Sequence, residues 1–444
     1  MNQRQDISKA DGYRGIWYSN QPTGDEYRYK YSGGLGTYPQ QLNPLAVHAP
    51  AARKTFFCWG GASADRKGGL LEMVSYFDHA TGTVPRPTIL AVKGTDDAHD
   101  NPTISLDDDG HLWVFCNSHG RSRDSFILRS VEPYSIDAFD RVAETNFSYS
   151  QPWHLSGQGF LFLHTRYHAA RSRVLHWSAS RDGLTWSEAR ILSNFAQGHY
   201  QVSAAAGGRV GTAFNYHPDP DGLNARTNLY YLQTLDFGAT WQTAGGVTVQ
   251  TPLTEPHNPA LVRDYQAEGL LAYLKDVAFD AEGRPVVLYL TSRTWAPGPQ
   301  GGLRQWWTAR WTGAAWEYLP FTTSDHNYDY GPLYIEPDGA WRVIAPTAPG
   351  PQPWGTGGEI VLWLSRDRGR SWQSVNQLTH DSPRNHSYVR KPVAAHEDFY
   401  AFWADGNAHE PSESHLYFTD KAGRNVWKLP PVMTADRAEP TRVG

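Results

Sequence analysis

The most regular feature of the chain is a repeated pair of apolar segments joined by a short turn. In most repeats an alternating strand is followed by a turn and then by a strongly apolar second strand, as in Asp107–Gly110 followed by HLWVF. Turns of this kind precede the second strands at residues 50–52, 107–110, 157–159, 207–208, 280–283, 337–339 and 396–398. Two further strands follow in each unit, of which RVLHWSAS and NLYYLQT are examples. The pattern is typical of repeat architectures built from four-stranded units.

The repeat predicts an all-β protein, a seven-bladed β-propeller with four antiparallel strands per blade. A single blade cannot bury both of its faces, so the ring has to close. We therefore expect one domain over residues 1–444, with residues 11–430 in the blades. No window of the sequence shows a convincing helical period.

Three units carry a second local signal between their third and fourth strands. Thr234–Trp241 and Ser365–Trp372 match the Asp-box pattern, and Ser180–Trp186 is one residue shorter. In such turns the Asp side chain caps backbone amides and Gly takes a positive φ. We predict a purely structural role on the outer rim.

Composition supports the strand-rich prediction and limits the partners. Aromatic residues make up 13% of the chain, with 18 Trp and 24 Tyr, and these fit pleated, half-buried surfaces. The net charge is −5 without a basic stripe, which argues against nucleic acid but leaves an acidic substrate open. No apolar run is long enough to span a membrane. We expect a monomer.

The cysteines and the N-terminal residues give information on the cellular compartment of the protein. Cys58 and Cys116 lie in apolar runs, which favours buried free thiols over a disulfide. The first residues contain no apolar stretch typical of a signal peptide. This predicts a cytoplasmic protein, or a periplasmic or secreted one if a leader has been removed.

Polar residues gather where a propeller binds ligands, at the mouth of its central channel. The innermost strands start there and the second strands end there. The starts of four innermost strands carry histidines, and the ends of second strands carry His, Arg, Tyr and Asn. A His before a strand often only caps backbone groups, and the Arg and Tyr side chains are also compatible with packing roles, so the cluster is more informative than any member. The candidate site residues are His99, Asn101, His119, Arg121, Arg166, Tyr167, His199, Tyr200, Tyr216, Arg226, Lys275, His326, His386 and Arg390.

The residue types at the predicted mouth help to distinguish hydrolysis from elimination. Hydrolysis by two carboxylates needs an Asp/Glu pair, and the predicted mouth offers only Asp100, Asp276, Asp325 and Asp405. Elimination from a uronic acid instead needs Arg or His to neutralise the substrate carboxylate, and a Tyr or His to transfer protons. The residues therefore favour a lyase. A glycoside hydrolase on the same linkage and a non-catalytic carbohydrate-binding propeller remain alternatives.

Several segments resemble one known family. The segments DGYRGIWYSNQPTGDEYRYKYSGGLGTYPQQ, TFFCWGG, AHDNPTI, NSHGR, GHYQVS, ARTNLYY, NHSYVRKP and FWADG are similar to a bacterial and fungal family of Asp-box propellers. That family includes ulvan lyases, rhamnose–glucuronate lyases and rhamnosidases on the same linkage. The resemblance covers residues 11–430.

The resemblance implies β-elimination next to a uronate, and it suggests roles. The paired family histidines fall on His99 and His119. Tyr200 and Tyr167 are the candidates for the acid/base, and Arg166 and Arg226 for the carboxylate-binding Arg. Some relatives have a His where this chain reads Gln41 and Leu42, which argues against a rhamnosidase mechanism at the opposite face. No cofactor is required; a structural Ca²⁺ or Zn²⁺ is compatible with the sequence, but no ligand spacing assigns a metal.

Overall fold

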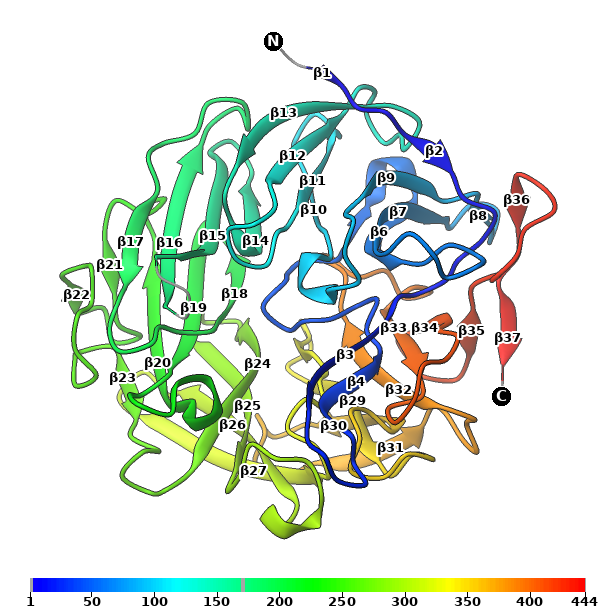
Figure 1. The fold of residues 1–444 in the computed structure, drawn as a ribbon. Coiled ribbons are helices and arrows are strands. Elements are labelled where there is room, and N and C mark those ends of the chain that lie inside the picture. Colours follow the sequence, from blue (N-terminus) through cyan, green and yellow to red (C-terminus); the bar gives the residue numbers. More distant parts are fainter. Residues whose placement is uncertain (1–2, 169–171, 444) are drawn as a thin grey trace.

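The sheets of the protein stand in a ring around a central axis. The computed structural model describes residues 3–168 and 172–443, and within these ranges the chain forms seven blades in sequence order (Figure 1). The only helical pieces in the described chain are short 3-10 turns: η1 (Pro50–Ala52), η2 (Ala98–Asp100), η3 (Gly222–Ala225) and η4 (Pro299–Gly301). The predicted seven-bladed β-propeller is confirmed.

Every blade is an antiparallel sheet, and its strands follow one another from the axis outwards, except that the last strand of blade 4 pairs with the third strand of that blade. Blade 1 contains β5 (Ala46–Ala49), β6 (Lys54–Gly61), β7 (Leu71–Asp78) and β9 (Thr88–Val92), and blade 2 contains β10 (Thr103–Leu106), β11 (Leu112–Cys116), β12 (Ser125–Ser130) and β13 (Phe139–Thr145). Blade 3 contains β14 (Ser148–Leu155), β15 (Gly159–Tyr167), β16 (Arg173–Ser180) and β17 (Arg190–Ser193). Blade 4 contains β18 (Gln201–Ala206), β19 (Arg209–Tyr216), β20 (Thr227–Thr234), β21 (Trp241–Gln242), β22 (Thr248–Val249) and β23 (Leu261–Arg263).

The last three blades continue the same order. Blade 5 contains β24 (Leu271–Phe279), β25 (Pro285–Ser292), β26 (Arg304–Trp311) and β27 (Trp316–Ser324). Blade 6 contains β28 (Leu333–Ile335), β29 (Trp341–Ala348), β30 (Glu359–Ser365) and β31 (Gln373–Gln377). Blade 7 contains β32 (Asn385–Arg390), β33 (Ala401–Gly406), β34 (Leu416–Thr419) and β35 (Val426–Lys428).

The two ends of the chain add strands that the repeat did not predict. β1 (Gln3–Arg4) pairs with β13 and β2 (Ser8–Lys9) pairs with β9, so the N-terminal segment edges blades 1 and 2. At the other end β37 (Thr441–Val443) pairs with β35, and β36 (Arg437–Ala438) pairs with β8 (Val84–Pro85) beside blade 1. Both ends therefore cover outer edges that would otherwise expose unpaired backbone groups.

A hairpin close to the N-terminus stands apart from the blades. Its strands are β3 (Trp17–Pro22) and β4 (Tyr29–Gly34). It is fixed to blade 7, because Trp17 Nε1 donates to the Asn407 carbonyl at 2.8 Å and Ser387 Oγ donates to the Gly34 carbonyl at 3.0 Å. In Figure 1 the hairpin lies over the strands of the late blades.

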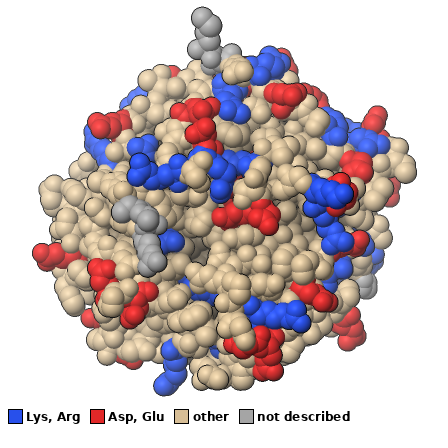
Figure 2. Space-filling view, in the orientation of Figure 1, with Lys and Arg blue, Asp and Glu red and all other residues tan. Residues whose placement is uncertain are grey.

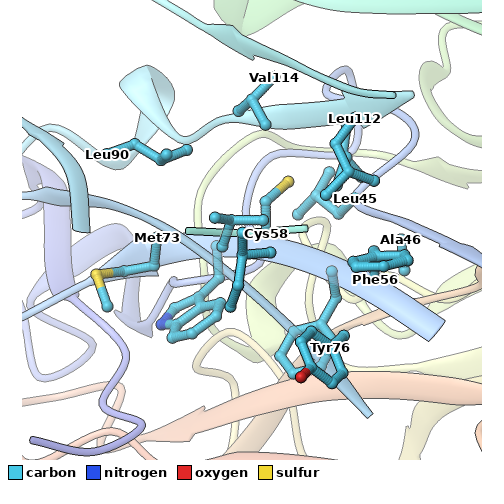
Figure 3. Close-up of a cluster of buried hydrophobic side chains, with 14 of the residues drawn as sticks. Leu45, Ala46, Phe56, Cys58, Met73, Tyr76, Leu90, Leu112 and Val114 are labelled. Carbon is cyan, nitrogen blue, oxygen red and sulfur yellow. The ribbon is translucent and has the colours of Figure 1, made fainter. Parts of the chain in front are cut away.

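The core lies between neighbouring sheets. One cluster joins blades 1, 2 and 7, and Figure 3 shows part of it, including Phe56, Cys58, Met73 and Leu112. Cys58 and Cys116 are both buried and free, as expected from their apolar runs. None of the helical pieces of the described chain is long and apolar enough to cross a membrane.

The three Asp-box turns have the expected local geometry. Asp236 Oδ1 accepts from the Thr240 amide at 2.9 Å, and Gly238 has a φ of 88°. A Cβ on Gly238 would lie 2.6 Å from the Trp177 ring, so this glycine also allows close packing. Trp241 is buried, whereas Trp186 and Trp372 are half-buried.

Candidate active site

A pair of stacked histidines joined by one carboxylate forms the centre of the candidate site. His99 lies in η2, just before β10, and His119 follows β11. Asp97 Oδ1 lies 2.5 Å from His99 Nδ1, and Asp97 Oδ2 lies 2.8 Å from His119 Nδ1. The two rings stack with centroids 4.0 Å apart. Antiparallel pairing of β10 and β11 brings these ends together, so the juxtaposition follows from the fold.

The two histidines differ in their other contacts. His99 is buried, and its Nε2 lies 2.5 Å from Tyr38 Oη and 3.1 Å from Tyr31 Oη. Burial lowers the pKa of His99 to about 4, so the ring is neutral at pH 7. His119 has a side chain that is 24% exposed, and its backbone amide donates to Asp100 Oδ1 at 2.6 Å. His119 is thus the member of the pair that solvent or a ligand can reach.

The carboxylate between the histidines is held ionised. Burial by itself would raise the pKa of Asp97, but the charges and hydrogen bonds of His99 and His119 hold it well below its ordinary range. One nitrogen or oxygen from each of the three residues lies within 4.8 Å of the others, which is a spacing that could hold a metal. Each oxygen of Asp97 is already bonded to the Nδ1 of one histidine. These contacts favour a hydrogen-bonded group over a metal centre.

Three tyrosines lie next to the histidine pair. Tyr149 Oη is 3.3 Å from Tyr200 Oη and 3.4 Å from Tyr167 Oη, and the three rings form one buried cluster. The His119 ring centroid is 5.8 Å from that of Tyr167 and 6.0 Å from that of Tyr149. Burial raises the pKa of Tyr167 to about 12, although the charge of Arg173 works against this shift. His99, His119, Tyr167 and Tyr200 therefore converge, as the sequence predicted.

Cationic side chains surround the tyrosines on the other side. The Arg173 guanidinium lies 5.3 Å from the Tyr167 ring and 5.4 Å from the Tyr200 ring, and that of Arg226 lies 5.0 Å from the Tyr200 ring. Lys30, on β4, is buried beside them, and burial together with the charges of Arg226 and Arg173 lowers the pKa of Lys30 to about 6. Arg173 and Arg226 therefore make this part of the site locally cationic inside a protein of net charge −5, whereas Lys30 is mostly neutral at pH 7.

Two buried side chains at the site, those of Arg226 and His217, have polar atoms without a hydrogen-bond partner among the described residues. Arg226 donates from Nε to the Leu223 carbonyl at 3.0 Å and from Nη2 to Tyr328 Oη at 2.9 Å, while its Nη1 finds no hydrogen-bond partner among the described residues. Neither ring nitrogen of the buried His217 has a partner in the described part of the chain. Burial and the charges of Arg173 and Arg226 hold the pKa of His217 well below its ordinary range. Buried polar atoms of this kind normally have a partner, which a bound ligand could provide.

The sequence did not point to Lys30, Asp97 or Arg173, and it placed Tyr149 and His217 at the mouth without making them candidate site residues. Arg173 starts β16 and pairs with Tyr167 across the β15–β16 hairpin, so a strand register could have revealed it. His217 follows Tyr216 directly at the end of β19. Its position at the end of a second strand therefore marks it in the same way as Tyr216. Lys30 gave no such signal, because only the tertiary fold of the β3–β4 hairpin brings it to the mouth.

Several predicted residues lie outside this convergence because their polar atoms have structural partners. His199 lies 3.1 Å from Ser193 Oγ and 3.0 Å from the Asn215 carbonyl, and His386 accepts from Trp403 Nε1 at 2.9 Å and lies 3.0 Å from Ser382 Oγ. Asn101 donates to the carbonyls of Leu35, Gly36 and Tyr38, and Arg390 donates to those of Thr37 and Pro39. These two side chains fix the loop that carries Tyr38.

The remaining predicted residues lie in three other places. Arg166 lies on the face of β15 opposite to Tyr167, where burial and also the Arg166 charge lower the pKa of His164 and of His176, so it does not join the tyrosine cluster. Tyr216 is bonded to Gln266 and packs with Phe195. Lys275 donates to the Asn327 carbonyl at 2.9 Å, His326 lies near Tyr328, and Arg121 is exposed.

The carboxylates differ from the predicted set. Asp97, which was not predicted, occupies the centre of the site. Asp100 accepts from Arg123 at 2.7 Å, Asp276 lies 2.5 Å from Lys391, and Asp405 lies 3.1 Å from Arg384. Asp325 accepts from the Trp354 amide at 2.7 Å. The expectation that Asp100, Asp276, Asp325 and Asp405 are the only carboxylates near the channel was wrong, because Asp97 precedes the η2 turn and caps it.

Comparisons with known proteins identify the family. A family model described as "BNR repeat-containing family member" matches residues 76–324, which is more than half of the chain. The chain belongs to this family. No curated protein sequence matches it.

Solved structures agree with the fold. A PL25 ulvan lyase bound to -[GlcA(1-4)Rha3S]- has a TM-score of 0.71 and 15% identity, over 94% of this chain and 96% of that chain. The polysaccharide lyase Uly1 has a TM-score of 0.66 and 10% identity, over 94% of this chain and 99% of that chain. At these identities the likeness shows the propeller fold, and the resemblance seen in the sequence motifs is confirmed for family and fold.

Proposed function

We propose that the protein is a polysaccharide lyase that cleaves a glycosidic bond at C4 of a uronic acid by β-elimination. The observation that carries this proposal is the group of buried cations beside the histidine pair and the three tyrosines. The likeness to ulvan lyases in fold and chain coverage supports it.

The cations provide a place for the substrate carboxylate. Among the described residues, Arg226 is bonded to neutral acceptors, the Leu223 carbonyl and Tyr328 Oη, and its Nη1 has no partner. Burying a cation without an anion is unfavourable, and a uronate would supply the missing charge. Neutralising the carboxylate also makes the proton at C5 more acidic, because negative charge develops on the carboxyl group during elimination.

His119 is the proposed base. Asp97 accepts the Nδ1–H of His119, which leaves Nε2 as the lone-pair nitrogen. His119 is also the exposed member of the pair. Its Nε2 would take the C5 proton while the C5–H electron pair forms the C4–C5 double bond.

Tyr167 is the proposed acid. It lies close to His119 and beside Arg173, and its raised pKa of about 12 keeps the phenol protonated at neutral pH. The C4–O bond breaks, its electron pair stays on the leaving oxygen, and the Tyr167 proton neutralises that oxygen. No water is consumed, which distinguishes the reaction from hydrolysis.

For the linkage we propose rhamnose–glucuronate. The support is the [GlcA(1-4)Rha3S] repeat bound in one structural neighbour and the sequence motifs shared with lyases of that linkage. The first experiment is incubation with ulvan and with gum arabic, followed by ultraviolet absorbance and mass spectrometry. A lyase gives an absorbing C4–C5 double bond and products lighter by one water than hydrolysis products. Saturated products would overturn the lyase assignment in favour of a hydrolase.

A charge-removing variant tests the carboxylate site. We expect Arg226→Gln to lower kcat/KM on an acidic glycan by about 10–100-fold, the worth of a hydrogen bond to a charged group. The loss should shrink on a substrate whose carboxylates are methyl esters. Arg166→Gln is the matched control, because Arg166 faces away from the tyrosines, and it should stay within a few-fold of the parent. The opposite ranking would place the carboxylate site near Arg166 instead.

A further inference from the structure

A second group of histidines lies on the face of the propeller opposite to the candidate active site. His48 is on β5, next to the turn into β6, and His79 follows the end of β7. His396 and Asp398 lie in the turn between β32 and β33 of blade 7. Turns between first and second strands lie at the end of the channel away from the mouth. The group therefore sits between the first and last blades, separate from the reaction proposed above.

The imidazole rings of this group are in mutual contact. The ring centroid of His396 lies 3.9 Å from that of His79 and 4.9 Å from that of His48, and those of His48 and His79 are 5.1 Å apart. One nitrogen of each of His79 and His396 and one oxygen of Asp398 all lie within 4.8 Å of one another. Two imidazole rings and one carboxylate in this space, with the His48 ring in contact with both histidines, are a donor set typical of a transition-metal site.

The hydrogen bonds leave one nitrogen of His79 available, whereas His396 Nδ1 accepts from the Asp398 amide at 3.2 Å and would have to give up this bond to bind a metal through Nδ1. Thr55 Oγ1 lies 2.8 Å from His79 Nε2 and 3.3 Å from His48 Nδ1, so one hydroxyl orients both rings. His79 Nδ1 is buried and has no hydrogen-bond partner among the described residues. A neighbour that orients a ring through one nitrogen and leaves the other free is the usual arrangement around a metal-binding histidine.

We propose that His79, His396 and Asp398 bind one Zn²⁺ ion, with the His48 ring at the fourth position. Zinc binds His nitrogen and Asp oxygen at about 2.0–2.2 Å in tetrahedral geometry, so the ligand atoms have to approach one another from their present spacing. Asp398 is exposed and lies on a turn, which lets it make this adjustment. Calcium is a poor match because it takes six to eight oxygen ligands.

The ion would reinforce the closure of the ring. The two segments already share backbone hydrogen bonds, since the His48 amide donates to the Val393 carbonyl and the Val393 amide donates to the Ala46 carbonyl, both at 2.9 Å. Zinc would add a bond network between the same segments in the folded state only. Binding to the folded state alone stabilises it by mass action.

The test is zinc titration of the full chain after dialysis against a chelator. We expect one site by calorimetry, a Tm rise of about 2–5 °C with Zn²⁺ and none with Ca²⁺. Co²⁺ should bind at the same site and give the visible absorption of tetrahedral cobalt. No zinc binding, or the same response to calcium, would overturn the proposal.

Variants separate this site from the other His–Asp group. His79→Ala should abolish the zinc response, and Asp398→Ala, at an exposed position, should weaken zinc binding by at least 10-fold even if His79→Ala does not fold. His119→Ala, which alters the His99–Asp97–His119 group, is the control and should keep the full response. Loss of zinc binding in His119→Ala, with Asp398→Ala unchanged, would show that the metal binds at the mouth instead. An inactive enzyme with an intact zinc response would contradict only the proposed function.

Discussion

The propeller contains two groups of histidines around an aspartate, and they differ in how the aspartate is used. At the mouth, Asp97 is mostly buried, and each of its oxygens is bonded to the Nδ1 of one histidine. On the opposite face, Asp398 is exposed, and its oxygen is 3.6 Å from His396. The first carboxylate fixes two tautomers, whereas the second leaves His79 Nδ1 without a partner among the described residues.

The difference teaches that residue types alone do not decide what a His–Asp group does. At the mouth, both oxygens of Asp97 are bonded, so the group fixes the orientation of the exposed His119 and determines which of its nitrogens carries the lone pair. This arrangement suits proton transfer. A group with a free buried nitrogen suits metal binding. The surroundings agree with this division, because the mouth has Arg173, Arg226 and three tyrosines nearby, while the other group has Thr55 as the orienting neighbour. On the face drawn in Figure 2, positive and negative groups are interspersed, while Arg226 beside the tyrosines is buried.

The largest expected effect that tests this comparison comes from His119→Ala. We expect turnover to fall by about 10²–10⁴-fold, the usual contribution of a general acid–base group. The free energy of unfolding should change little, because His119 is partly exposed. Steady-state kinetics on the substrate identified above, with urea unfolding in parallel, measure both quantities. Full activity would mean that the base lies elsewhere.

Acid should destabilise the mouth through His99. The pKa of this ring is about 4 in the folded state against an ordinary value of 6.5, so the unfolded chain binds a proton over this range while the folded chain does not. Falling pH therefore favours unfolding, and the stability is fully present above the unfolded pKa. Each pKa unit corresponds to about 1.4 kcal/mol, which gives a loss of about 3 kcal/mol between pH 7 and pH 4 from this group. Urea unfolding across this range measures it, and an unchanged midpoint would contradict the buried neutral ring.

The smallest expected effect compares the two aspartates directly. Asp97→Asn can accept from only one histidine, so the tautomer of the pair is disturbed, and we expect turnover to fall on the order of 10-fold to 10²-fold. Asp398→Asn should leave turnover unchanged, because Asp398 lies on the opposite face. The turnover of the two variants, measured under the same conditions, tests this expectation. Equal activity in both would remove the distinction drawn between the two groups.

The sequence predicted those parts of the site that depend on one blade. His99 and His119 belong to neighbouring strands of blade 2, so the repeat and the turn positions were enough to bring them together. Tyr167 and Tyr200 mark the end of β15 and the start of β18 in the same way. The blade count followed from the turns, because turn chemistry and strand alternation are local properties of the chain.

Only the tertiary structure decided which neighbours complete the site. Arg166 and Arg226 looked equivalent in the sequence, yet side-chain alternation along β15 turns Arg166 away from Tyr167, while Arg226 stacks on Tyr200. Lys30 reaches the mouth because its hairpin packs on blade 7, and His79 meets His396 because the last blade closes against the first. These contacts join residues far apart in the chain, and such distances are fixed by the closing of the ring and the packing of its blades, which local sequence patterns do not specify.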